Sequence, residues 1–301
     1  MSGVNAFPVK KEYEKNPDIS PEDIRKLREW LKTQPHLPEK YITELDLILL
    51  FFCCEKSAEV SKQVLDLHYT LRTHLTTWFL NRVVDKKIIQ CMNTVLITPF
   101  PTFTADGYKV IYCRLLDGDP KRYMFNDIVR VFGMVFDLYQ YAEGTWPGLV
   151  VLIDMDLTCI GHVGRIDLST LRQVIIFHQE CMLTKLKEVH FLNAPYFMDR
   201  FMSLVRPFAK KSFMDMIKIH ERGSKSIYQY VPKSAFPKEL GGNYKDNITL
   251  RDEMIRHLGD NKQYYEEEGR KRVNESLRPN GKTNVEDLFG IQGSFKKLEI
   301  D

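Results

Sequence analysis

The stretch EVHFLNAPYFMDRFMSLVRPF occupies residues 188–208 and changes its periodicity midway. Residues 189–192 predict a buried strand, residues 193–195 a turn, and the remainder a helix. On that helix, apolar side chains spaced three and four residues apart form one stripe: Phe197, Phe201, Leu204, Val205 and Phe208. Two methionines widen the stripe over most of the circumference. A helix that covers one face of a sheet needs less apolar surface than this.

The segments on both sides of this stretch alternate between strand and helix patterns. Strands are predicted at 108–116, at 149–153 and around 216–219, and helices at 125–141 and 168–183. The run LVVLI at 149–153 is continuously apolar, which is typical of a central parallel strand covered on both faces. Alternating strands and helices predict an α/β fold with a mixed, mostly parallel sheet and right-handed crossovers.

The first part of the chain shows helix signals and no strand signal. Ser20 precedes proline and two acidic residues, the pattern of a capped helix start. We therefore divide the chain into four parts by pattern and composition. These are a loose N-terminal lead (1–19), an all-α three-helix domain (20–84), an α/β domain (85–250), and a C-terminal helix and tail (251–301), with the helix expected at 260–278.

Composition excludes several classes of protein. The 301 residues are 44% hydrophobic with a net charge of +3, which is too balanced for an obligate nucleic-acid binder. The N-terminus lacks the apolar core of a signal peptide. The longest apolar stretch, 45–54, is about half as long as a membrane-spanning helix, which needs about 20 residues. Six cysteines without a C-x-x-C pair are typical of reduced thiols. We expect a cytoplasmic protein whose membrane contact is peripheral.

One motif suggests catalysis. Asp154 and Asp156 directly follow the LVVLI strand in a D-x-D-x-T pattern, which resembles the nucleophile motif of Mg²⁺-dependent haloacid-dehalogenase-type phosphatases. The late acidic pair that this chemistry also needs is missing from the sequence. The alternative is that Asp154 ends the strand and holds a turn through its carboxylate.

The histidines and the common nucleotide motifs offer little further chemistry. His162, His178 and His190 lack the spacing of a zinc site, so we expect no metal. His178 falls on the apolar face of its helix, where a hydrogen-bonded core histidine is the ordinary interpretation. No glycine-rich phosphate loop and no G-x-S-x-G motif occurs, so neither a nucleotide nor a serine nucleophile is predicted.

Four stretches, in order along the chain, resemble the CRAL-TRIO lipid-binding family. They are LREWLKTQPHLPE with the following Leu-Phe run (27–52), GLVVLIDMD (148–156), VHFLNAPYFMDRFMSLVRPF (189–208) and FPKELGGN (236–243). The retinaldehyde- and tocopherol-binding branch fits best. One departure is FFCCEK at 51–56, where the family usually carries arginines.

The resemblance implies a pocket for a lipid beneath a movable helix. It places eleven residues in the pocket: Val129, Phe132, Phe136, Leu149, Ile153, Val174, Phe177, His178, Met182, Val189 and Phe191. The gate helix would carry the stripe Phe197, Phe201, Leu204, Val205 and Phe208. Phe132 and Phe136 stand where the tocopherol-binding member has serines, so we expect a narrower pocket at that end.

The resemblance also implies a function without catalysis or cofactor. We expect a monomeric carrier that holds one retinoid, carotenoid, tocopherol or similar isoprenoid and exchanges it at membranes. A basic rim would contact anionic or phosphoinositide lipid: Lys185, Lys187, Arg206, Lys210 and Lys211. The alternatives are a phosphoinositide or phospholipid transfer protein of the same fold, and the Asp154/Asp156 phosphatase.

Overall fold

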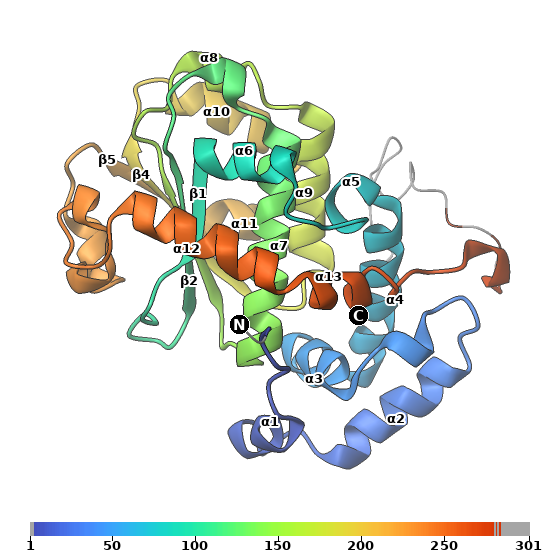
Figure 1. Ribbon diagram of the computed structural model, residues 1–301. Coiled ribbons are helices and arrows are strands. Elements are labelled where there is room, and N and C mark those ends of the chain that lie inside the picture. The colour runs from blue at the N-terminus through green and yellow to red at the C-terminus, as the bar shows by residue number, and fades with distance from the viewer. Residues whose placement is uncertain (1–2, 280, 282, 284–301) are drawn as a thin grey trace.

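The computed structural model describes residues 3–279, 281 and 283. Figure 1 shows the sheet on one side and the first helices, in blue, on the other, with helix α7 (Phe125–Glu143) between them. Within the described residues, no helix is both long and apolar enough to cross a membrane. The four-part division of the chain remains a prediction.

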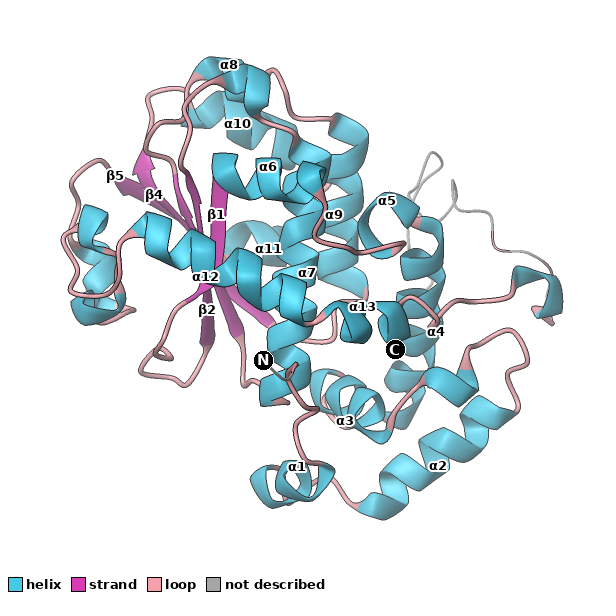
Figure 2. Cartoon of the chain, viewed as in Figure 1, coloured by secondary structure: helices cyan, strands magenta, loops and turns pink. Residues whose placement is uncertain are grey.

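The sheet has five strands in the order in which they occur along the chain, seen in magenta in Figure 2. They are β1 (Val95–Pro99), β2 (Lys109–Leu115), β3 (Leu149–Asp154), β4 (Leu186–Ala194) and β5 (Ile217–Glu221). β1 pairs antiparallel with β2, and the other neighbours are parallel. The predicted mixed, mostly parallel α/β fold is therefore confirmed.

The three crossovers between parallel strands lie on one face of the sheet. They consist of α7, α8 (Ile160–Val163) with α9 (Leu168–Glu180), and α10 (Met198–Val205) with α11 (Lys211–Asp215). Crossovers of the same hand that advance in the same direction along a sheet must all cover the same face. The opposite face is covered by three short 3₁₀ turns (Ser226–Gln229, Lys233–Ala235, Lys238–Leu240) and by the start of α12 (Asn247–Asp260), whose remainder packs against β1, α6 (Lys86–Thr94) and α7.

Side chains of the central strand alternate between these two layers. Val150 and Leu152 belong to the apolar cluster that contains Phe236 and Leu250 of the covering segment. Val151 and Ile153 point the other way and pack with α7 and α9. Both faces of β3 are therefore buried, which explains its uninterrupted apolar sequence.

The N-terminal helices pack beside the α/β layer. They are α2 (Pro21–Lys32), α3 (Glu44–Cys53), α4 (Ala58–His74), α5 (Thr76–Phe79) and α6 (Lys86–Thr94), with one 3₁₀ turn at Glu39–Tyr41. At the start of α2, the Ser20 hydroxyl accepts a hydrogen bond from the Asp23 amide at 3.2 Å, as the capping pattern predicts. Helices α4 and α5 contact α9 and α7.

The predicted loose lead is wrong in its middle. Residues Val9–Lys15 form helix α1, and the side chain of Glu12 on it is fully buried. The Glu12 carboxylate accepts hydrogen bonds from the amide and the hydroxyl of Thr145, both at 2.8 Å. This contact with a residue more than a hundred positions away holds the segment, so a local pattern could not reveal it.

The charged helix predicted at 260–278 is present only in its first part. Helix α13 (Lys262–Glu268) ends early, and the chain continues without helix to a 3₁₀ turn at Glu275–Leu277. Lys271 is buried and pairs with Asp46 at 2.7 Å, while the Arg272 guanidinium donates to the carbonyl oxygens of Arg72 and Phe79. The positive charges face partners from the N-terminal helices instead of solvent. Most of the predicted tail, 279–301, lies outside the described residues.

Candidate functional site

A cavity of about 270 Å³ lies between the sheet and its crossover helices. Each strand contributes to its wall, for example Ile97, Cys113, Ile153, Phe191 and Ile217, and α7, α9, α10 and α11 close it from the other side. Its volume is near the lower end of the roughly 300–1,000 Å³ that small-molecule pockets occupy. The wall is mostly apolar, and its polar groups are a few residues at and just after the carboxyl ends of β2 and β3 and the histidines of α8 and α9.

Seven of the eleven predicted pocket residues line this cavity. They are Val129, Phe132, Ile153, Val174, His178, Val189 and Phe191. They come from α7, β3, α9 and β4, so segments far apart in the sequence meet here. The side chains of the sheet residues follow the strand alternation that sends every second residue toward the crossover helices.

The other four predicted residues lie away from the cavity. Leu149 is on the same face of β3 as Ile153 but at the opposite end of the strand, where it is fully buried. The Phe136 ring packs at 5.6 Å and nearly perpendicular to the Trp146 ring, which closes the core one helical turn beyond Phe132. Phe177 and Met182 face the N-terminal helices and line a different, smaller pocket.

The predicted gate helix corresponds to α10, and two of its five named residues line the cavity, Phe201 and Val205. The Phe201 ring packs at 5.4 Å from that of Phe191. Phe197 is the buried N-cap residue, and Leu204 and Phe208 pack at the edge of the same apolar cluster. Phe213 on α11 also lines the cavity, so the wall on this side is longer than predicted.

Beside one end of the cavity, the carboxyl ends of β2 and β3 carry a polar cluster around the buried carboxylate of Asp154. It accepts hydrogen bonds from Arg114 at 2.5 Å, from the Tyr112 hydroxyl at 3.2 Å and from the Asn193 amide group at 2.8 Å. The backbone amide of Asp156 donates to it at 3.0 Å, and the Asp156 side chain pairs with Arg114 at 3.0 Å. This geometry favours the interpretation of Asp154 as the residue that holds the turn after β3, over that of a phosphatase nucleophile.

Two histidines reach the cavity wall with different partners. His178 lies within 2.7 Å of the Val174 carbonyl through Nδ1, and burial lowers its pKa. His162 accepts a hydrogen bond at Nδ1 from the Cys159 amide at 3.0 Å, and burial lowers its pKa as well. The Nε2 atom of His162 is buried and has no hydrogen-bond partner within residues 3–279, 281 and 283. The third singled-out histidine, His190, is buried beside His220, 2.9 Å away, and does not line the cavity.

Comparison with known proteins places this architecture. A model of the CRAL/TRIO domain matches residues 93–242, the segment that contains the whole sheet and the cavity, and a model of a Pinta-like UBA domain matches residues 16–89. The chain belongs to the CRAL/TRIO family. Proteins of this family bind and transfer lipids.

Individual relatives of this CRAL/TRIO chain are distant. Clavesin-1 from Pongo abelii is 25% identical over 237 residues, which cover 77% of this chain and 66% of Clavesin-1. Human Clavesin-2 is 23% identical over 234 residues, covering 77% of this chain and 71% of Clavesin-2. The crystal structure of Sfh5 superimposes with a TM-score of 0.49 at 14% identity, over 77% of this chain and 92% of that one.

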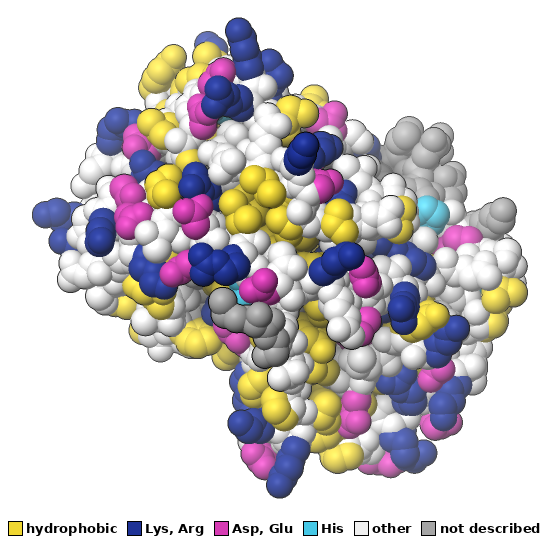
Figure 3. Space-filling model, viewed as in Figure 1, with side chains coloured by type: hydrophobic (Ala, Val, Ile, Leu, Met, Phe, Trp, Pro, Cys, Tyr) yellow, Lys and Arg dark blue, Asp and Glu magenta, His cyan; other side chains and the backbone are white. Residues whose placement is uncertain are grey.

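The predicted basic rim of the CRAL/TRIO domain is spread over several elements. Lys185 pairs with Glu55 in the turn after helix α3, and the Lys187 ammonium lies 5.5 Å from the centre of the Tyr108 ring. Lys210 pairs with Glu180 at 2.7 Å, Lys211 pairs with Asp215 at 3.0 Å, and Arg206 is exposed. On the face seen in Figure 3, basic and acidic side chains are interspersed. Whether the rim binds lipid stays a prediction.

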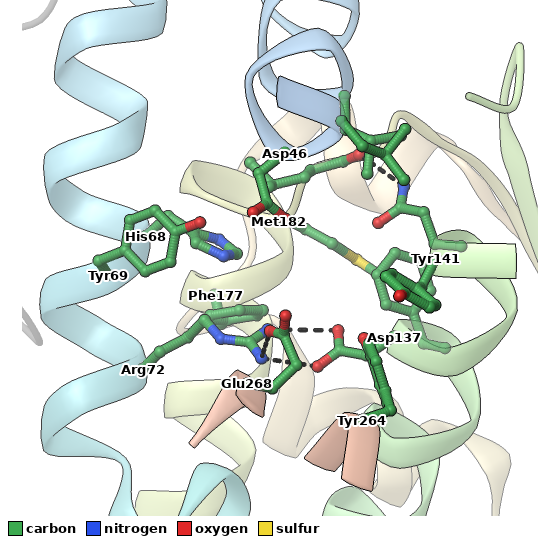
Figure 4. Close-up of a pocket in the computed structure, with 15 residues that line it drawn as sticks. Asp46, His68, Tyr69, Arg72, Asp137, Tyr141, Phe177, Met182, Tyr264 and Glu268 are labelled. Carbon is green, nitrogen blue, oxygen red and sulfur yellow. Dashed lines mark hydrogen bonds and ion pairs between the residues drawn. The ribbon is translucent and has the colours of Figure 1, made fainter. Parts of the chain in front are cut away.

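A second pocket lies where α3 and α4 meet α7, α9 and α13, and the sequence did not reveal it. It has about 40 Å³ and is lined by charged and aromatic side chains (Figure 4). Arg72 lies between Asp137, at 2.7 Å, and Glu268, at 3.2 Å, and Arg82 reaches Asp137 at 2.6 Å. Burial would raise the pKa of Asp137, but the two guanidinium groups outweigh it and hold that pKa well below its usual range. The signal that could have found this site is Asp137 itself, an acid within an apolar helix.

Proposed function

We propose that this protein is a cytoplasmic carrier that holds one hydrophobic small molecule and exchanges it at membranes. A retinoid, carotenoid, tocopherol or similar isoprenoid is the ligand class that we expect. The observation that supports this most is the apolar cavity of about 270 Å³ inside a CRAL/TRIO domain, with α10 as one of its walls.

Helix α10 has the features of a wall that can move. It is eight residues long, and its inner contacts, such as Phe201 on Phe191, are apolar and not hydrogen bonded. Apolar contacts can be exchanged for contacts with lipid at little cost, because both environments exclude water. The segment before α10 is held, since the Asn193 side chain bonds Asp154 and Asn193 has the left-handed φ of 52° that asparagine tolerates. We therefore expect α10 to pivot near residues 193–197.

The energetics require such a motion. Each buried CH₂ group contributes about 0.8 kcal/mol, so a ligand of about 15 carbons gains on the order of 12 kcal/mol before ordering costs. Escape into water would forfeit that gain, whereas transfer into a bilayer would not. An apolar wall that opens against a membrane solves this problem.

The test is to purify the full chain and to identify bound lipid by native mass spectrometry and organic extraction. We expect about one lipid molecule per chain. A matched variant, Val174→Trp, places a large ring in the cavity and should reduce lipid occupancy, whereas the surface change Lys262→Trp should not. A protein that purifies empty and takes up no added lipid would contradict the carrier proposal. Extraction of a two-chain phosphoinositide would replace the isoprenoid ligand with a phospholipid.

A further inference from the structure

The polar end of the cavity contains a hydrogen-bond donor that the fold does not use. We infer that the Nε2–H group of His162 donates a hydrogen bond to the ligand, and that the ligand is an apolar molecule with one neutral oxygen acceptor, a hydroxyl or a carbonyl, at one end. This inference rests on the proposed carrier function and narrows its ligand class.

The position of the proton on His162 follows from its neighbours. A backbone amide can only donate, so the Nδ1 atom that lies 3.0 Å from the Cys159 amide must accept and carries no hydrogen. Burial lowers the pKa of His162, so the ring is neutral near pH 7 and bears its single hydrogen on Nε2. The donor is thus fixed by the turn that begins α8.

The donor is buried on the cavity wall. His162 is 2% exposed, it lines the cavity, and its Nε2 atom has no partner within the described part of the chain. The Tyr123 ring, 5.2 Å away and perpendicular, and the side chains of Val163 and Ile166 form the apolar wall beside it. A buried donor without an acceptor is unfavourable, and an acceptor on the ligand would relieve this.

The charges near this end favour a neutral acceptor. Among the described residues that line the cavity, Arg114 is the one arginine or lysine, and its guanidinium is shared between the carboxylates of Asp154 and Asp156. Asp156 also pairs with Arg222 at 3.2 Å, so two acids face two bases. A ligand carboxylate would have to leave water without a free counter-charge on this wall, which costs more than one hydrogen bond returns.

The experiment compares two variants of the full chain. The variant His162→Asn places an amide oxygen where Nδ1 was. It therefore keeps the acceptor for the Cys159 amide and removes the Nε2–H donor. His162→Gln extends one bond further and returns an N–H group to the region of Nε2. Three probes have the same farnesyl hydrocarbon skeleton: farnesol carries a hydroxyl, farnesene has no oxygen, and farnesoic acid carries a carboxylate. Their Kd values are measured by displacement of Nile red.

We expect His162→Asn to weaken farnesol binding about threefold to tenfold and to leave farnesene unchanged, because one neutral hydrogen bond is lost. His162→Gln should recover most of the loss. In the unchanged protein, the ¹⁵N resonance of His162 Nε2 should shift with farnesol and not with farnesene, which tests the contact even if the variants do not fold.

Three results would overturn the inference. Equal weakening of farnesol and farnesene would assign His162 a purely structural role, unchanged binding of both would remove it from the site, and tighter binding of farnesoic acid than of farnesol would contradict the neutral acceptor. In each case the protein still binds a hydrophobic molecule and the carrier proposal stands. Failure of all three probes and of extracted lipid to bind would instead contradict the carrier proposal.

Discussion

The apolar cavity and the small charged pocket lie toward different ends of the same two helices, α7 and α9, and their linings differ in polarity. Helix α7 presents Val129 and Phe132 to the cavity and Asp137 to the charged pocket, while α9 presents Val174 to one and Phe177 to the other. Both helices are apolar over most of their circumference because both are buried on two sides. The comparison teaches that an apolar helix does not indicate which part of its length faces a ligand.

The difference between the two sites is also one of mechanics. Paired charges in the small pocket tie the N-terminal helices and α13 to α7. Each of these buried ion pairs is favourable only while its charged atoms keep their distance and orientation. The contacts of the cavity wall depend little on orientation, because apolar contacts are non-directional. We therefore expect changes in the charged pocket to affect folding and changes in the cavity to affect binding.

The largest effect should follow Asp137→Ala. It leaves the buried guanidinium groups of Arg72 and Arg82 without their shared carboxylate, which typically costs about 3–5 kcal/mol. Urea unfolding monitored by circular dichroism measures the loss. The control is Asp215→Ala, whose exposed pair with Lys211 is worth about 0.5 kcal/mol or less. If the two variants unfold alike, the charged pocket does not stabilise the junction.

A second comparison uses two phenylalanines one turn apart on α7. Phe136→Ala removes a ring packed against Trp146 and should cost about 3–5 kcal/mol of unfolding free energy. Phe132→Ala should cost less, because part of its ring borders the cavity, and it should admit a bulkier ligand. Unfolding and lipid-binding titrations on both variants decide this. The opposite order of stabilities would place the end of the cavity elsewhere.

A pH effect of intermediate size should come from His68, which lines the charged pocket. Burial, aided by the nearby Arg72 charge, lowers its pKa in the folded chain to about 3. The unfolded chain binds that proton near pH 6.5, so stability is complete above pH 6.5 and falls as the pH decreases toward 3. Between pH 7 and pH 5 we expect a loss of about 2 kcal/mol from this group.

The variant His68→Asn checks the assignment. Its amide can still donate to the Cys181 carbonyl, which His68 Nδ1 contacts at 2.7 Å, but it cannot titrate. Unfolding free energies at the two pH values should differ less in the variant than in the unchanged protein. Identical pH dependence in both proteins would exclude His68 as its source.

The smallest effect should be at the predicted basic rim. Lys187→Ala should weaken binding to vesicles that contain anionic lipid by about 1 kcal/mol, roughly fivefold, and this difference should vanish at high salt. Lys185→Ala should do less, because Glu55 already neutralises that lysine. Vesicle co-sedimentation measures both, with Lys262→Ala on α13 as the control. Equal binding by all three variants would remove the rim from the membrane contact.

Sequence patterns were sufficient for the parallel core of the fold. The strand–helix alternation and the LVVLI run both reflect burial, which strand and helix periodicity record directly. Strand β1 was missed because it is short, antiparallel and bounded by Pro99, features of an edge rather than of a core strand. Helix α1 and the segment around Lys271 were mispredicted because distant partners, Thr145 and Asp46, determine their structure.

The sequence predicted which faces of the strands and helices point toward the cavity, but not how far the cavity extends along them. Seven pocket residues could be placed on the cavity because strand alternation and helix spacing orient them. Phe136 and Leu149 have the correct orientation for their elements, but Trp146 and its neighbours fill the space beyond them. Where packing stops and a cavity begins depends on the sum of many side-chain volumes, which periodicity does not contain.

The late position of Arg272 has a consequence for synthesis. Every residue of the cavity wall has been made once Ile217 leaves the ribosome, yet the guanidinium that joins Arg72 and Phe79 follows more than fifty residues later. At about 5–20 residues per second, the nascent chain spends roughly 3–11 s with its cavity complete and its N-terminal helices not yet fastened. During translation, that interval is the period in which a first lipid could enter a cavity whose neighbouring helices α4 and α5 are not yet held by Arg272.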